Sequence, residues 1–527
     1  MNFYQARPRL AQAGAVFAAA ALIAGCGNNY RPSITSISNS GPPAQPASYV
    51  AVVSAPSASA PGVATIIDYS GDSIIATATI GPGPTSFTLD ATGTTAYTIQ
   101  SDQTMWSFPV STSLQEKQVS YTTLPPNAQP LNLLAPSAGL WASDLSGNLA
   151  DLFQGSPETY VRSVPVAPAP VMLAGAISSP ARLFALSQNI AAPTGVECNT
   201  PPFSAITSNG TATGIETSNF SVSSQLVLDP SNPTNDPHGA MNARCPVYAV
   251  VSSDGQRLFV LNRGSDTVSV INIPNDTLDN CVCPSTGCVN QDNQKYTCHP
   301  ILPLSLNAVA ALNTITPTPS YATPPNGTSG MTQTAGPVYA EYNGATNQLV
   351  VANYDAGTIS VIDVTLDEYG NDSPTFGTTY TIPVGANPAS VTVLYDGSRA
   401  YTANQTDQTV TIVYLASHTV KKTLTGITGH PRTVVSTQNS TQGKVYVASP
   451  DREVLTIIRT DQDIVDTTLP MVGNIVDTRV SSQNAVGGNS NNVSRIPGYG
   501  QPCNLPPSLE PAPVGAQTPL QVCQQMP

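Results

Sequence analysis

Residues 384–413 read VGANPASVTVLYDGSRAYTANQTDQTVTIV, and this stretch decides the fold. Runs of β-branched and small apolar residues predict three short strands, at 389–394, 400–403 and 410–413. Gly385 opens a turn because glycine tolerates a positive φ, and the pair Asp396-Gly397 is typical of a tight hairpin reversal. A fourth strand is predicted at 419–424, so the unit is a small antiparallel meander.

Imperfect copies of this unit recur along the chain. Asn262, Asn353 and Asn404 each precede the first apolar residue of the following strand by six positions (268 − 262, 359 − 353 and 410 − 404). An asparagine at a strand end can hydrogen-bond the turn backbone, so we interpret the three as structural. A single small sheet cannot bury its own apolar faces, so the copies must pack on one another. Radial packing gives a β-propeller, which the repetition favours over a β-sandwich.

The unit resembles the YVTN-type β-propeller repeat, which runs V-G-x-x-P, a strand, D-G, a strand ending in Asn, then S-V-I-D. The matching positions are Val384, Gly385, Pro388, Asp396, Gly397, Tyr401 and Asn404. Two further copies lie at 253–271 and 348–363. The resemblance covers the second half of the chain well and the first half loosely.

The spacing predicts an all-β fold, a single propeller of about eight four-stranded blades, or seven if the divergent fourth unit is broken. The first unit begins at Tyr49 and lacks its first strand. A strand-like run at 474–480 follows the last complete unit, and we expect it to complete the first blade and close the ring.

Residues 1–25 are predicted to be a signal peptide, with Arg7 and Arg9 before an apolar run too short to span a bilayer comfortably. The run ends in Ile23-Ala24-Gly25-Cys26, which resembles the lipobox of bacterial lipoproteins. The resemblance implies cleavage before Cys26 and its acylation, which anchors the protein stably to a membrane. Gly27 after this cysteine favours the outer membrane, facing the periplasm or the cell surface.

The rest of the chain divides by composition. Residues 26–47 are rich in Ser, Pro and Asn and predict a flexible tether. The propeller is assigned to 48–480, and 481–527 is predicted to be a loosely ordered tail. Insertions interrupt the middle units at 190–209, 230–246, 274–299 and 307–336, with a shorter one at 367–376. Strand order places those at 190, 230 and 307 on one face and the other two opposite. Such loops are either binding surfaces or inert elaboration.

Composition excludes some partners. Only 10% of residues are charged and the formal net charge is −13. Nucleic-acid binding needs clustered Lys and Arg, which are missing here, so we expect no nucleic-acid partner. Electrostatic attachment to anionic lipid is disfavoured for the same reason, which leaves the covalent lipid as the membrane contact.

Apart from Cys26, the chain has eight cysteines, all in the insertions or the tail: Cys198, Cys245, Cys281, Cys283, Cys288, Cys298, Cys503 and Cys523. An even number in an exported protein predicts disulfides, which stabilise loops that no β-core holds. A metal site around Cys281, Cys283, Cys288 and Cys298-His299 is the alternative, but its spacing fits no paired zinc pattern. The haem motif C-x-x-C-H is absent, because Lys295 stands where its first cysteine would be.

No catalytic motif is present in the sequence, so no catalytic residue, metal or cofactor is assigned. His238 and His430 lie at turns between units and could face the same end of a central channel, although turn histidines are ordinary. We favour a lipid-anchored binding or scaffold module of the cell envelope that presents its insertion loops to a protein, peptide or glycan. The alternative is an enzyme at the channel mouth, such as a lactonase-like hydrolase or a propeller that binds a redox cofactor, as in relatives of the resembled family.

Overall fold

The computed structural model describes residues 49–481, except 70, 137–138, 176–181, 192, 194–196, 200–202, 204–205, 229–242, 281–287, 290–294, 305–308, 313–334, 438–440 and 442. Side chains at 309–312 are also not described. All of these residues belong to a unit that spans 46–527. The predicted signal peptide, the tether with Cys26, and the tail after Ser481 therefore lie outside the described residues. In the described part, no helix is long and apolar enough to cross a membrane.

Eight antiparallel blades make up the fold, and we number the strands of each blade from the centre outward. Blade 1 consists of β36 (Asn474–Val480), β1 (Tyr49–Ala55), β2 (Pro61–Asp68) and β3 (Ser73–Pro82). Blade 2 consists of β4 (Pro84–Leu89), β5 (Thr95–Gln100), β6 (Thr104–Pro109) and β7 (Ser120–Thr123), with a 3-10 turn, η1 (Glu116–Gln118), before β7. Blade 3 consists of β8 (Pro130–Leu134), β9 (Leu140–Asp144), β10 (Leu149–Gly155) and β11 (Glu158–Pro165). Blade 4 consists of β12 (Pro170–Gly175), β13 (Arg182–Ser187), β14 (Thr211–Glu216) and β15 (Ser221–Val227).

The second half contains the elaborated blades. Blade 5 has β16 (Pro246–Val251), β17 (Arg257–Asn262) and β18 (Thr267–Asn272), and β18 pairs at its two ends with β19 (Thr277–Leu278) and β22 (Ile301–Pro303). Blade 6 has β24 (Pro337–Asn343), β25 (Gln348–Asn353), β26 (Thr358–Asp363) and β27 (Thr379–Pro383), with β23 (Val309–Leu312) added outside β27. Blade 7 has β28 (Pro388–Val393), β29 (Arg399–Asn404), β30 (Thr409–Tyr414) and β31 (Thr419–Leu424). Blade 8 has β32 (Thr433–Ser436), β33 (Lys444–Ala448), β34 (Val454–Arg459) and β35 (Ile464–Pro470).

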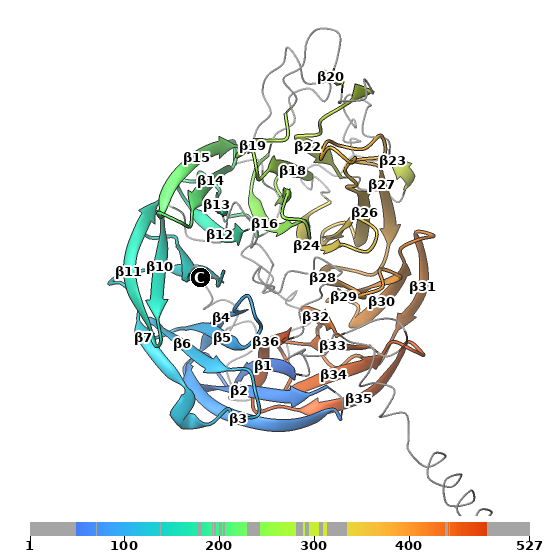
Figure 1. Ribbon diagram of the computed structural model, residues 1–527. Coiled ribbons are helices and arrows are strands. Elements are labelled where there is room, and N and C mark those ends of the chain that lie inside the picture. Colours follow the sequence, from blue (N-terminus) through green and yellow to red (C-terminus); the bar gives the residue numbers. More distant parts are fainter. Residues whose placement is uncertain are drawn as a thin grey trace, which may run out of the picture. The chain divides into compact units, whose positions relative to one another are not determined.

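These blades close into a ring around a common centre (Figure 1). Each innermost strand contacts the next, from β4 through β8, β12, β16, β24, β28, β32 and β36 back to β4. The predicted closure is confirmed, because β36 pairs antiparallel with β1 from Val50↔Val480 to Ala55↔Asn474. The count is eight, since the divergent fourth unit forms a complete blade.

The apolar core lies between blades rather than along one axis. Each of five hydrophobic clusters joins two neighbouring blades, and a sixth runs from blade 4 to blade 7. Val53 of β1 and Phe87 of β4, for example, belong to one cluster and are both fully buried. Neighbouring blades thus cover the sheet faces that one meander would leave in water.

The turn that opens blade 7 differs in detail from the prediction. The residue with a positive φ is Asn387 (55°), whereas Gly385 does not lie in the left-handed region. Gly385 is required for close packing, because a Cβ there would lie 2.7 Å from the side-chain amide of Asn404. The Asp396-Gly397 turn is as predicted, with φ of 65° at Gly397.

The recurring asparagines join two strands of a blade. Their side-chain amides donate to hydroxyl groups and not to the turn backbone, which was the expected partner. The Nδ2 of Asn404 donates to Thr409 Oγ1 (3.0 Å) and to Thr411 Oγ1 (2.8 Å). Asn353 makes the same pair of contacts five and seven residues ahead, with Thr358 (3.0 Å) and Ser360 (2.9 Å). Asn262 repeats the pattern in blade 5 with Thr267 (3.3 Å) and Ser269 (2.8 Å). In each blade, one amide ties the second strand to the third.

We expect Asn404→Ala to lower the free energy of unfolding by about 1–3 kcal/mol, because it removes the donor to the partly buried hydroxyl of Thr409 and to the buried hydroxyl of Thr411. Asn353→Ala should cost a similar amount, since its contacts are equivalent. Urea unfolding of both variants checks this. Two variants indistinguishable from wild type would show that the repeated amide has no structural role.

Candidate functional site

The insertions emerge on two opposite faces. Face A carries the loops between strands one and two and between strands three and four of each blade; face B carries the remaining loops. The insertions at 190–209, 230–246 and 307–336 lie between strands two and three of blade 4 or between blades, so their described residues next to β13, β14, β16 and β24 lie on face B. Those at 274–299 and 367–376 follow strand three of blades 5 and 6, so their described residues next to β18 and β26 lie on face A.

Arg263 is the centre of the contacts on face B. It follows β17 and its side chain is 1% exposed. Its Nη2 lies 2.9 Å from Asp355 Oδ1, which follows β25 in the next blade. Its guanidinium carbon lies 5.7 Å from the ring centre of Phe203 and 5.6 Å from that of Tyr354. Phe203 belongs to the first insertion, so Arg263 joins this insertion to blades 5 and 6.

The third insertion returns to the ring beside the same arginine. The backbone N–H of Gly336 donates to Asp266 Oδ1 at 2.9 Å. Burial raises the pKa of Asp266 to about 6. Gly336 has φ of 64°, and a Cβ there would overlap the carboxylate of Asp355 at 2.0 Å. Only glycine therefore allows this return path.

The second insertion is tied to the first. Arg244 Nη1 donates to the carbonyl of Ile206 at 3.2 Å. The next residue, Cys245, forms a disulfide with Cys198, and both cysteines are fully buried. We call Cys198, Phe203, Cys245, Arg263, Asp266, Gly336 and Asp355 the insertion anchor. It gathers described residues of three insertions at one place on face B.

Replacing both Cys198 and Cys245 with alanine should lower the free energy of unfolding by about 4 kcal/mol, because the bond closes a loop with a sequence separation of 47. Either single replacement should cost about as much as the double one, since each breaks the same bond. Denaturant unfolding under non-reducing conditions measures the loss. A double variant as stable as wild type would contradict this estimate.

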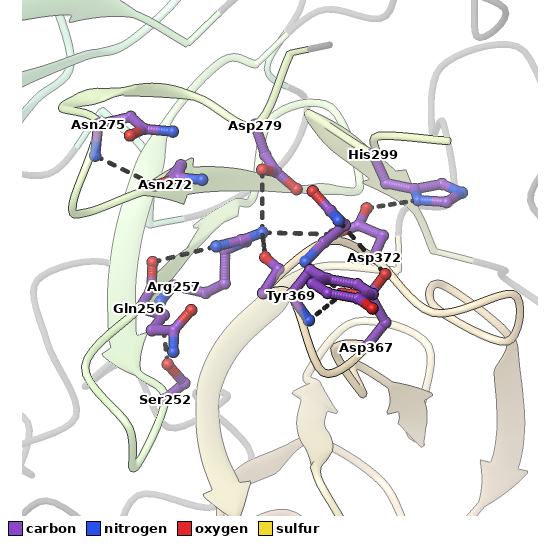
Figure 2. Close-up of polar contacts among 12 residues, drawn as sticks. Ser252, Gln256, Arg257, Asn272, Asn275, Asp279, His299, Asp367, Tyr369 and Asp372 are labelled. Atoms are coloured by element: carbon purple, nitrogen blue, oxygen red, sulfur yellow. Dashed lines mark hydrogen bonds and ion pairs between the residues drawn. The ribbon is translucent and has the colours of Figure 1, made fainter. Parts of the chain in front are cut away.

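Face A holds a buried charge cluster that we name the Arg257 cluster (Figure 2). It consists of Arg257 at the start of β17, Asp279 after β19, His299 before β22 and Asp372 between β26 and β27. Arg257 Nη2 lies 3.3 Å from Asp279 Oδ1 and 3.6 Å from Asp372 Oδ1. The same nitrogen donates to the carbonyl of Gly370 at 2.9 Å. His299 Nδ1 lies 2.7 Å from Asp372 Oδ2.

The electrostatics of the cluster follow from its burial, since all four residues are only 2–4% exposed. Burial, together with the negative charge of Asp372, raises the pKa of Asp279 to about 7. Burial raises the pKa of Asp372 to about 6 and lowers that of His299. The single guanidinium of Arg257 thus faces two carboxyl groups that both resist ionisation.

The Arg257 cluster can position loops, and through Arg257 it also borders a small cavity. A cavity of about 220 Å³ adjoins it, lined among others by Arg257, Tyr342, Asp367 and Gly370. Perturbed carboxyl groups often mark active sites. Here they join the insertion at 274–299 to the loop at 367–376, which belong to neighbouring blades. No sequence pattern indicates the cluster, because isolated acids in two insertions carry no spacing signal.

The histidines named from the sequence do not form a described pair. His238 lies outside the described residues. His430 lies in the turn between blades 7 and 8 but is only 3% exposed. Its Nδ1 lies 2.8 Å from Asp451 Oδ2, and its Nε2 lies 3.0 Å from Gln408 Nε2. Burial alone would raise the pKa of Asp451, but the hydrogen bonds from His430 outweigh it and lower that pKa. Both ring nitrogens of His430 are therefore engaged inside the protein.

The cysteines are partly described. Besides the Cys198–Cys245 bond, Cys288 and Cys298 each take part in a disulfide. Cys281, Cys283, Cys503 and Cys523 lie outside the described residues. Within the described ranges, no group of three or more His, Cys, Asp or Glu side chains is arranged to hold a metal ion.

Comparison with known proteins supports the fold alone. No family model and no curated protein matches the chain, so the YVTN-type resemblance stays a prediction. Among solved structures, the dihydro-heme d1 dehydrogenase NirN in complex with DHE superposes with a TM-score of 0.53 and 12% identity, covering 84% of this chain and 77% of that one. Apo AztD from Citrobacter koseri gives 0.48 and 11%, covering 82% and 96%. A putative 6-phosphogluconolactonase from Bacteroides fragilis gives 0.44 and 12%, covering 83% and 99%.

Proposed function

We propose that this protein is a binding or scaffold propeller of the cell envelope, tethered by a lipid on Cys26. It presents its face B insertions to a protein, peptide or glycan partner. The observation that supports the proposal is the insertion anchor, in which three insertions from separate parts of the chain meet around Arg263. Loops held on a rigid scaffold are the common place for binding.

The anchor gives a physical reason for binding there. A loop that must be ordered on association costs about 0.5–1.5 kcal/mol for each side chain that is immobilised. The Cys198–Cys245 bond and the buried Arg263–Asp355 pair fix the bases of the insertions before any partner arrives. Part of the free-energy cost of ordering the loops therefore arises on folding and not on binding.

Catalysis at the channel mouth is the less favoured function. The described acids whose pKa is raised to about 6 or 7 are Asp151, Asp266, Asp279 and Asp372. All four are at most 5% exposed. Asp266 accepts a backbone N–H and the last two flank Arg257. These carboxyl groups thus serve packing contacts rather than a solvent-facing reaction.

Excision of residues 313–334 tests the binding function, because it removes the central part of the third insertion and keeps Leu312 and Ala335. Cross-linking in whole cells, followed by purification and mass spectrometry, should recover a partner with wild type and lose it with this variant. A chain truncated after Ser481 is the control and should keep the partner. Equal recovery from all three chains would overturn the choice of face B.

The lipid tether has its own test. Cells given a labelled fatty acid should incorporate the label into wild type and not into Cys26→Ala, and only wild type should sediment with the outer membrane. Label in the Cys26→Ala protein, or wild type found in the soluble fraction, would refute the anchor and leave the binding test untouched.

A further inference from the structure

A cleft of about 550 Å³ opens on face A between blades 2 and 3. Blade 2 contributes the turn after β4 and Tyr97 from β5. Blade 3 contributes Ala135, Pro136 and Gly139 after β8 and the hairpin between β10 and β11. Its volume lies in the range of pockets that bind small molecules, about 300–1,000 Å³. The cleft shares no residue with the insertion anchor or with the Arg257 cluster.

One wall of the cleft is apolar and firmly packed. Tyr97, Leu140 and Phe153 line it and belong to the same hydrophobic cluster. The Phe153 ring packs edge-on against Tyr160, with centroids 5.9 Å apart and an interplanar angle of 69°. These side chains are fixed before any ligand binds. Phe153 and Leu140 are 0% and 2% exposed, so the apolar surface open to a ligand comes from Tyr97 (9% exposed) and from the partly buried Ala91 and Pro136.

Two carboxylates, one from each blade, complete the cleft. Asp90 is held in its turn by the N–H of Thr94 at 2.8 Å and by the hydroxyl of Thr92 at 2.9 Å. Glu158 begins β11 and also lines the cleft. Neither carboxylate forms an ion pair with any described residue, and no Lys, Arg or His belongs to the described lining.

The potential inside the cleft is negative as a result. Burial is the largest cause that raises the pKa of Tyr97, and the charge of Glu158, its hydrogen bond with the Tyr97 hydroxyl and the charge of Asp90 add to it. A cation reaching this point would be attracted by both carboxylates. An anion would meet repulsion and no basic side chain of the described lining.

We propose that this cleft binds a small organic amine, whose ammonium group lies between Glu158 and Asp90 and whose apolar part lies against Tyr97, Ala91 and Pro136. The volume and the apolar wall disfavour a bare metal ion, which would leave most of the cleft unfilled. Asp90 also already accepts hydrogen bonds on both carboxylate oxygens, which disfavours tight metal coordination.

Benzylamine is the probe for this site, and benzyl alcohol is its neutral counterpart of nearly equal shape. Isothermal titration of the full mature chain near neutral pH should show saturable binding of benzylamine. Benzyl alcohol should bind at least tenfold more weakly, and raised salt should weaken the amine alone. Equal binding of the two compounds, or binding of calcium but not of benzylamine, would overturn the proposal.

Glu158→Gln should weaken benzylamine binding at least tenfold, because it removes one of the two charges that face the ammonium. Glu453→Gln is the matched control, since Glu453 is exposed at the turn before β34 and its replacement changes the net charge equally. Circular dichroism should show both variants folded. Unchanged affinity in Glu158→Gln, or an equal loss in Glu453→Gln, would also overturn the proposal.

Discussion

A chain that ends after Gly473 should lose cooperative unfolding, because it lacks β36, the innermost strand of blade 1. Loss of β36 exposes the backbone of β1 from Val50 to Ala55, to which it is paired. The ring then opens between blade 8 and blade 1. An open ring presents two unpaired sheet edges and uncovers the apolar layers between blades 8, 1 and 2.

Side chains of β36 also join both neighbouring blades. Asp477 Oδ1 accepts from Thr433 Oγ1 of blade 8 at 2.9 Å, and Arg479 Nη2 donates to the carbonyl of Phe87 in blade 2 at 2.9 Å. Arg479 is 2% exposed and pairs with Asp477 at 2.8 Å. Removing the strand thus breaks contacts on two interfaces at once.

Thermal unfolding followed by circular dichroism, with size-exclusion chromatography, measures the effect. The control ends after Ser481, keeps the whole of β36, and should unfold like the full chain. If the shorter chain unfolds cooperatively at the same midpoint temperature as the control, the pairing of β36 with β1 does not hold the ring together.

Arg257→Met should lower the free energy of unfolding by about 3–5 kcal/mol near pH 8, because it leaves two buried carboxyl groups without their cation. It also removes the donor to the carbonyl of Gly370. Arg459→Met is the matched control, since Arg459 pairs with Asp461 on the surface and its loss should leave stability unchanged. Equal unfolding midpoints for the two variants would refute this role.

The cost of Arg257→Met should shrink in acid. The pKa values of Asp279 and Asp372 are raised to about 7 and about 6 from an ordinary 3.8. At about pH 5 both carboxyls therefore hold protons in the folded protein, and little charge needs the guanidinium. A cost that is the same at both pH values would mean that the carboxyls do not titrate in this window.

The same shifts fix the sign of the pH dependence in the wild type. Between 3.8 and about 7, the folded protein retains a proton on Asp279 that the unfolded chain releases. Its contribution to stability therefore falls as pH rises through this range. His299 has the opposite effect. Burial lowers its pKa below 6.5, so its contribution to stability is lost as pH falls. Asp279→Asn should reduce this decrease of stability with rising pH, and urea unfolding at several pH values checks it. An unchanged pH dependence of stability would contradict the role given to Asp279.

Much of the fold could be predicted from the sequence because its determinants are local. The Asp396-Gly397 turn, the β-branched runs around it and the interval between Asn404 and the next strand are short-range patterns that repeat in register. The repetition indicated a four-stranded blade. A strand-like run at 474–480, outside any complete unit, predicted that the C-terminal strand pairs with the first unit and closes the ring. The bonds of the asparagines were misjudged, because their partners lie on the neighbouring strand.

The sequence by itself determined the class of fold, the closed ring and the placement of insertions between particular strands, since turn chemistry and hydrophobic alternation act within a few residues. Only the tertiary structure decided that Arg257 meets Asp372, that Phe203 packs on Arg263 and that Glu158 faces the same cleft as Asp90. These partners come from different blades or insertions, 60 or more positions apart (263 − 203 is the smallest separation). Their meeting depends on how rigid sheets pack around a ring, and no short-range pattern records that.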